Sequence, residues 1–122
     1  MSPKAKTVLI VDDDEPTRKL LDALMRRSAL SCLAASNGQA AIEVLESRDD
    51  VACIILDLMM PTTDGSTVIA YLARTGKRIP VIVCTAMLPS TMPALDPAIV
   101  RTVIRKPFDV EQMAETVMAF IE

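Results

Sequence analysis

The sequence predicts an α/β fold in which five parallel strands form a doubly wound sheet with helices on both faces. Short apolar runs alternate with segments of helical period five times along the chain. The run at 51–56 is apolar without alternation, which is typical of a strand buried on both faces. The chain has 122 residues, of which 51% are hydrophobic, so we expect residues 1–122 to form a single domain.

The first half of the chain opens with a strand and a helix. Residues 7–11 form a β-branched apolar run that predicts the first strand. Acidic residues and Pro16 follow, and both suit the first turn of a helix. Leucines and a methionine then recur at helical spacing, which predicts a helix over about 15–28. We next expect a strand at 31–35, a helix at 39–47 and a strand at 51–56.

The second half of the chain continues the alternation. A helix is expected after Gly65, ending at Gly76 in the C-cap position. The apolar run at 81–85 predicts the fourth buried strand. The fifth strand is expected at 101–104, and the final helix covers about 110–121.

The stretch between the last two strands breaks the pattern. Pro89, Pro93 and Pro97 fall within nine residues. A proline inside a helix costs about 3 kcal/mol. We therefore expect the fourth helix to be short, irregular or broken in two.

Charge and hydropathy exclude two classes of function. The net charge is -3 and there is no basic block, which argues against direct nucleic acid binding by this domain. No apolar stretch is long enough to span a membrane, and no signal peptide opens the sequence. We therefore expect a cytoplasmic domain that does not contact the membrane.

The cysteine and histidine counts exclude further chemistry. Cys32, Cys53 and Cys84 form no CxxC pair, and the chain has no histidine, so a zinc site is not expected. The missing histidine also removes Ser-His-Asp and Cys-His catalysis. The three cysteines are expected to be small buried hydrophobic residues with reduced thiols.

Polar residues stand where the expected strands end. In parallel sheets of this kind, ligands bind at the carboxyl ends of the strands, at the switch in strand order. We therefore expect one site built from the residues after the first, third, fourth and fifth strands: Asp12 and Asp13, Asp57, Thr85, and Lys106.

Three carboxylates at one rim repel each other unless one takes a proton or a cation joins them. Oxygen ligands without histidine or cysteine favour a hard ion such as Mg²⁺. A carboxylate beside Mg²⁺ and Lys106 is well placed to accept a phosphoryl group, and the Thr85 hydroxyl could bond to one of its oxygens. Alone, each residue has an ordinary alternative: a turn aspartate for Asp57, a strand-end threonine for Thr85 and a surface lysine for Lys106. Asp14 is expected to be solvated or to cap the helix.

The chain resembles the CheY-like receiver domains of two-component response regulators. Four motifs carry the resemblance, in order and at the family spacing, over nearly the whole chain. They are Val-Asp-Asp-Asp at 11–14, Asp-Leu-Met-Met-Pro-Thr-Thr-Asp-Gly at 57–65, Val-Cys-Thr-Ala at 83–86 and Lys-Pro-Phe at 106–108. The resemblance implies a flavodoxin-like (βα)5 fold with strand order 2-1-3-4-5.

The resemblance also implies roles for the rim residues. Asp57 would be the phosphoacceptor, served by a sensor histidine kinase or a phosphotransfer protein, with Thr85 and Lys106 assisting. Such a domain is no conventional enzyme, because it assists only its own aspartyl phosphorylation and dephosphorylation. By the same resemblance the Lys106–Pro107 peptide is expected to be cis. Mg²⁺ would be held by Asp12, Asp13, Asp57 and the backbone carbonyl of Met59.

Two features depart from the family pattern. Val103 stands three residues before the motif lysine, where the family usually has an aromatic that rotates inward during switching. The three prolines lie where the family has its fourth helix, which commonly belongs to the output face. We therefore expect signalling to use a reshaped surface or a different one. The sequence identifies neither the downstream partner nor whether the domain forms a homodimer.

Three other functions fit the sequence less well. A phosphorylation-independent adaptor or dimerisation module would use the same fold, and the complete set of rim residues argues against it. A Mg²⁺-dependent phosphohydrolase normally needs a second acid two residues after the nucleophile, where this chain has Met59. A flavin-binding protein would need a phosphate-cradling loop after the first strand, and none follows it.

Overall fold

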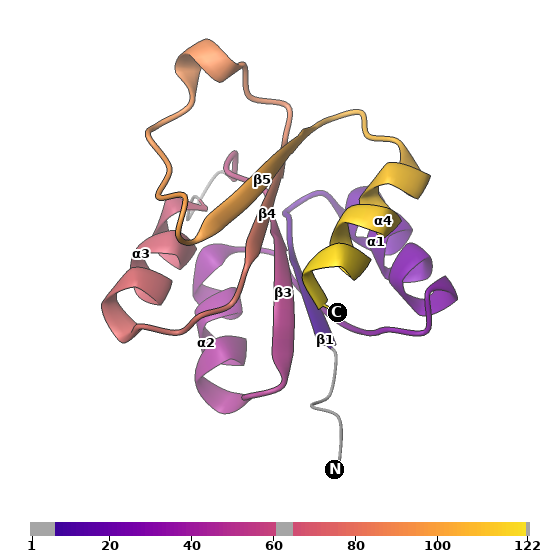
Figure 1. Cartoon of the computed structure of the whole chain (residues 1–122), viewed down its shortest axis with the longest axis horizontal. Helices are drawn as coiled ribbons and strands as arrows, with labels where there is room; N and C mark the ends of the chain where they lie inside the picture. The colour runs from indigo at the N-terminus through magenta and orange to yellow at the C-terminus, as the bar shows by residue number, and fades with distance from the viewer. Residues whose placement is uncertain (1–6, 61–64, 122) are drawn as a thin grey trace.

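The computed structural model describes residues 7–60 and 65–121. Its five strands form one parallel sheet in the order β2-β1-β3-β4-β5, as predicted (Figure 1). The switch in order lies between β1 and β3, where the chain first runs outward to β2 and then returns. The strands are β1 (Thr7–Val11), β2 (Ser31–Ala35), β3 (Val51–Leu56), β4 (Val81–Thr85) and β5 (Val100–Arg105).

Helices cover both faces of the sheet. In Figure 1, one pair of helices, α1 and α4, lies on one side of the strands, and α2 and α3 lie on the other. Alternate strand residues face opposite sides, so there are two apolar cores, one under each helix pair. The helices are α1 (Glu15–Arg27), α2 (Gly38–Ser47), α3 (Ser66–Thr75) and α4 (Val110–Ile121).

Local signals explain where the helices begin and end. The Asp14 side chain caps α1 by accepting from the Thr17 N–H at 3.0 Å, which confirms the capping alternative for this aspartate. Helix α3 ends at Gly76, whose φ of 72° lies in the left-handed region that glycine adopts without strain. Within the described residues no helix is long and apolar enough to cross a bilayer.

The segment between β4 and β5 is irregular, as the prolines predicted. Residues 88–98, here called the proline segment, contain only a three-residue 3-10 turn, Pro89–Thr91. The expected (βα)5 pattern therefore has four α-helices in the described part of the chain. Leu88 in this segment is 56% exposed, and Val103 on the edge strand β5 is 40% exposed.

The cysteines follow the expectation with one exception. Cys53 and Cys84 are buried, whereas Cys32 on the edge strand β2 is only half-buried, and all three are free thiols. Burial raises the pKa of each thiol to about 12. The thiols are therefore protonated at neutral pH, as structural cysteines usually are.

Candidate functional site

The sheet ladder continues past the strand ends and fixes the residues that follow them. The Asp12 N–H donates to the Ala35 carbonyl at 3.1 Å, and the Asp57 N–H donates to the Val11 carbonyl at 2.9 Å. The Lys106 N–H donates to the Thr85 carbonyl at 2.9 Å. The rim residues predicted from the sequence are thus held at one edge of the sheet, next to the switch in strand order.

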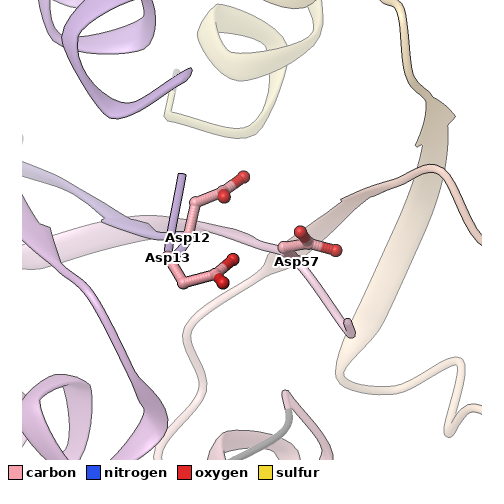
Figure 2. A group of neighbouring side chains, drawn as sticks. All are labelled: Asp12, Asp13 and Asp57. Carbon is pink, nitrogen blue, oxygen red and sulfur yellow. The ribbon is translucent and has the colours of Figure 1, made fainter. Parts of the chain in front are cut away.

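Three carboxylates lie close together at this edge (Figure 2). One oxygen from each of Asp12, Asp13 and Asp57 lies within 4.8 Å of the others. Asp12 and Asp57 are 2% and 5% exposed, whereas Asp13 is exposed. An all-oxygen cluster with one open side fits a hard cation that keeps part of its water shell, so these three residues could bind Mg²⁺.

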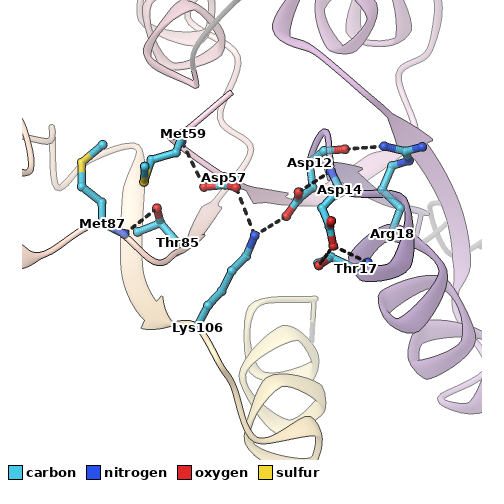
Figure 3. Close-up of polar contacts among 9 residues, drawn as sticks. All are labelled: Asp12, Asp14, Thr17, Arg18, Asp57, Met59, Thr85, Met87 and Lys106. Carbon is cyan, nitrogen blue, oxygen red and sulfur yellow. Dashed lines mark hydrogen bonds and ion pairs between the residues drawn. The ribbon is translucent and has the colours of Figure 1, made fainter. Parts of the chain in front are cut away.

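Lys106 joins the two buried carboxylates (Figure 3). Its Nζ lies 2.7 Å from Asp12 Oδ2 and 3.0 Å from Asp57 Oδ2. Its side chain is 20% exposed, so both ion pairs are largely shielded from water. One ammonium does not neutralise three carboxylates, and the site keeps an excess of negative charge.

The pKa shifts at the rim follow from burial and from these contacts. Burial raises the pKa of Asp12, and the hydrogen bond from Lys106 offsets this only in part. Burial alone would lower the pKa of Lys106, but its bonds to the two carboxylates outweigh that and raise it. The lysine therefore stays charged, while the fold disfavours the charged form of Asp12.

The second oxygen of each buried carboxylate is held by the backbone. Asp57 Oδ1 accepts from the Met59 N–H at 3.0 Å, and Asp12 Oδ1 accepts from the Asp14 N–H at 2.9 Å. Each carboxylate therefore has one oxygen on a backbone N–H and the other on Lys106. Four bonds of this kind fix both side-chain orientations before any ligand arrives.

Thr85 stands at the end of β4, the strand next to β3. It is fully buried, and its Oγ1 accepts from the Met87 N–H at 3.2 Å. In Figure 3, Thr85 lies on the β4 side of Asp57, away from Asp12. Because the hydroxyl is an acceptor in this bond, its own proton remains available to a further partner.

Sequence reasoning missed one residue at the rim. The Arg18 guanidinium donates from Nη1 to the Asp12 carbonyl at 2.8 Å (Figure 3). A signal was present, because a basic residue in the first turn of a helix opposes the helix dipole and calls for a local reason. The Lys106–Pro107 peptide is cis, as the resemblance implied.

Comparison with known families decides the classification. The model of the response regulator receiver domain matches residues 8–118. The chain belongs to this family. Receiver domains are not a classical enzyme family.

Individual relatives agree with the family match. The transcriptional regulatory protein SrrA of Staphylococcus aureus is 44% identical over 79 residues, which are 65% of this chain and 32% of SrrA. The match thus spans about a third of that relative's length.

Solved receiver domains share the whole fold. A CheY-like receiver domain protein from Methanospirillum hungatei is 28% identical, with a TM-score of 0.82 over 95% of this chain and 94% of that one. The response regulator TrrA of Thermotoga maritima, solved in complex with Mg²⁺-BeF, is 25% identical, with a TM-score of 0.82 over 94% and 98% of the chains.

Proposed function

We propose that this receiver domain is a phosphorylation-controlled switch, with Asp57 as its phosphoacceptor. The observation that carries the proposal is the setting of Asp57: a 5%-exposed carboxylate, 3.0 Å from a lysine ammonium, beside two further carboxylates. A structural turn aspartate needs none of these neighbours. The phosphoryl donor would be the phosphohistidine of a sensor histidine kinase or of a phosphotransfer protein.

The metal ligands of the proposal are the three rim carboxylates, Asp12, Asp13 and Asp57, together with the backbone carbonyl of Met59. The donor set is oxygen only. Burial raises the pKa of Asp12, so the fold disfavours the charged carboxylate, and an added cation would stabilise that charge. When bound, Mg²⁺ supplies positive charge that balances the phosphoryl oxygens. Lys106 adds a second positive charge at Asp57 Oδ2, while the Met59 N–H bonds to Oδ1.

The residues of the chain supply the remaining steps. A carboxylate oxygen of Asp57 attacks the phosphorus; the new O–P bond forms as the donor's N–P bond breaks, and the donor imidazole leaves. Lys106 is already placed to neutralise one phosphoryl oxygen, and the Thr85 hydroxyl donates its unused proton to another. The same groups serve the later hydrolysis, in which water displaces the phosphoryl group from Asp57.

Phosphorylation of Asp57 would then change which partner the domain binds. Coupling of this kind typically amounts to about 1–3 kcal/mol. Since Val103 replaces the usual aromatic and the proline segment replaces a helix, the signal would reach the surface through the Thr85–Met87 contact and the residues that follow it. Residues 1–122 would form one receiver domain.

The test is direct phosphorylation of the intact protein. Incubation with acetyl phosphate and Mg²⁺, followed by intact mass spectrometry, should show the gain of one phosphoryl group. The adduct should be labile to hydroxylamine, absent when Mg²⁺ is chelated and absent in Asp57→Asn. A wild-type protein that binds Mg²⁺ but gains no phosphoryl group, from acetyl phosphate or from a phosphorylated kinase, would favour the adaptor function instead.

A further inference from the structure

Arg18 makes an unusual contact for a cation surrounded by acids. It lies half-buried in the first turn of α1, close to a cluster of aspartates. In the described part of the chain its side chain forms no ion pair, and its one hydrogen bond goes to the backbone carbonyl of Asp12 (Figure 3). The 2.8 Å bond ties the start of the helix to the residue that ends β1.

This bond completes the fixation of Asp12. The Asp12 N–H is bonded to Ala35, and its carboxylate is bonded to Asp14 and Lys106. The Asp12 carbonyl is the remaining polar group, and Arg18 holds it. Since that carbonyl belongs to the peptide joining Asp12 to Asp13, its direction sets the direction in which Asp13 leaves the strand.

Asp13 depends on that peptide more than its neighbours do. Among the described residues, no hydrogen bond or ion pair holds its carboxylate, whereas Asp12 and Asp57 each have partners on both oxygens. Yet Asp13 contributes an oxygen within 4.8 Å of the other two. Its place in the cluster therefore comes from the backbone that carries it.

We propose that Arg18 is a positioning residue for the cation site: by holding the Asp12 carbonyl, it orients the Asp12–Asp13 peptide and keeps the Asp13 carboxylate in the cluster. This inference rests on the proposed Mg²⁺ site and concerns its affinity, not the identity of the phosphoacceptor. Groups that orient metal ligands in this way commonly change metal affinity by about 10- to 100-fold when removed.

The sign of the effect separates positioning from charge. Arg18 is a cation near a cation site, so its charge alone repels Mg²⁺, and removing the charge would tighten binding. A positioning role predicts the opposite, because the loss of the carbonyl bond frees the peptide and loosens Asp13. A weaker Mg²⁺ affinity in a charge-removing variant therefore cannot come from electrostatics.

The experiment is a calorimetric titration of the full chain with Mg²⁺. Arg18→Met is expected to weaken Mg²⁺ binding about tenfold. Arg18→Lys keeps the charge and one N–H donor, and should recover part of the loss. The matched control is Arg26→Met on the same helix, which removes the same charge from an exposed pair with Asp22 and should leave Mg²⁺ affinity unchanged or slightly higher.

Thermal unfolding without Mg²⁺ shows whether each variant is folded. If Arg18→Met does not fold, the comparison uses Arg18→Lys against Arg26→Lys, and at constant charge only Arg18→Lys should weaken binding. Mg²⁺ affinity in Arg18→Met equal to or tighter than in wild type would overturn the inference. That result would leave Asp57 phosphorylation intact, whereas failure of wild type to be phosphorylated would overturn the proposed function alone.

Discussion

Two regions that follow strands of the same sheet are held very differently. One is the rim at the carboxyl ends of the strands, and the other is the proline segment between β4 and β5. At the rim, both buried carboxylates have partners on each oxygen, and three strand ends are tied by backbone hydrogen bonds. The proline segment has one short 3-10 turn, and Leu88 at its start is 56% exposed. The difference shows that the rim is built from strand ends and does not require the helix that the prolines exclude.

The two regions would therefore carry different parts of the function. The rim is rigid and polar, which suits chemistry in which charges must be in place before the reaction. The proline segment is weakly packed and partly apolar, which suits a surface whose contacts change with phosphorylation. Substitutions on each side test this division.

The largest expected effect is at Lys106. Replacement by methionine keeps the aliphatic stem but removes the charge that neutralises Asp12 and Asp57. Acetyl phosphate should then phosphorylate Lys106→Met about 100-fold more slowly than wild type, measured as a time course of intact mass. The matched control is Lys19→Met, which removes a charge from an exposed pair with Glu15 on α1. Equal rates in the two variants would remove Lys106 from the proposed site.

A smaller effect is expected from the buried charge of Asp12. Burial raises its pKa in the fold above the ordinary value of 3.8, so the folded protein binds this proton more tightly than the unfolded chain. The stability contributed by the protonated form is complete below pH 3.8 and is lost as the pH rises through the folded pKa. At neutral pH without Mg²⁺, Asp12→Asn should therefore be more stable than wild type.

Urea unfolding from pH 7 down to pH 3.8 measures this difference, which should shrink as the pH falls through the folded pKa of Asp12. Added Mg²⁺ should stabilise wild type more than Asp12→Asn, since the variant has lost a ligand. Asp22→Asn, which removes a partly exposed acid from α1, serves as the control and should change stability little. An Asp12→Asn protein less stable than wild type at neutral pH, without Mg²⁺, would show that the bond to Lys106 outweighs the burial of Asp12.

Much of this architecture could be predicted from the sequence. Four of the five strands begin and end where the sequence predicted, and for β1, β3 and β4 the reason is that a strand buried on both faces is apolar almost throughout. The polar residues that follow the apolar runs predicted the rim. The three prolines predicted that the segment between β4 and β5 would not be a regular helix.

What could not be predicted is how side chains pair across elements. The bond from Arg18 to Asp12 joins a helix side chain to a strand-end carbonyl, and no periodicity reports such a contact. The same holds for the two backbone N–H groups that orient Asp57 and Asp12. Cys32 is only half-buried because β2 is an edge strand. The strand order implied partial exposure at this position, whereas the residue type suggested burial.

The smallest effect is expected in the proline segment, and it tests the comparison most directly. Leu88→Ala removes an exposed side chain and should lower the free energy of unfolding by less than about 0.5 kcal/mol. The matched control is Leu72→Ala on α3, where the leucine is 1% exposed and the expected loss is about 2–4 kcal/mol. Phosphorylation of Leu88→Ala by acetyl phosphate should proceed at the wild-type rate. A slower rate would mean that the proline segment supports the rim and that the two regions act as one unit. The most direct connection is Met87, which precedes Leu88 in the chain and whose N–H donates to the Thr85 hydroxyl.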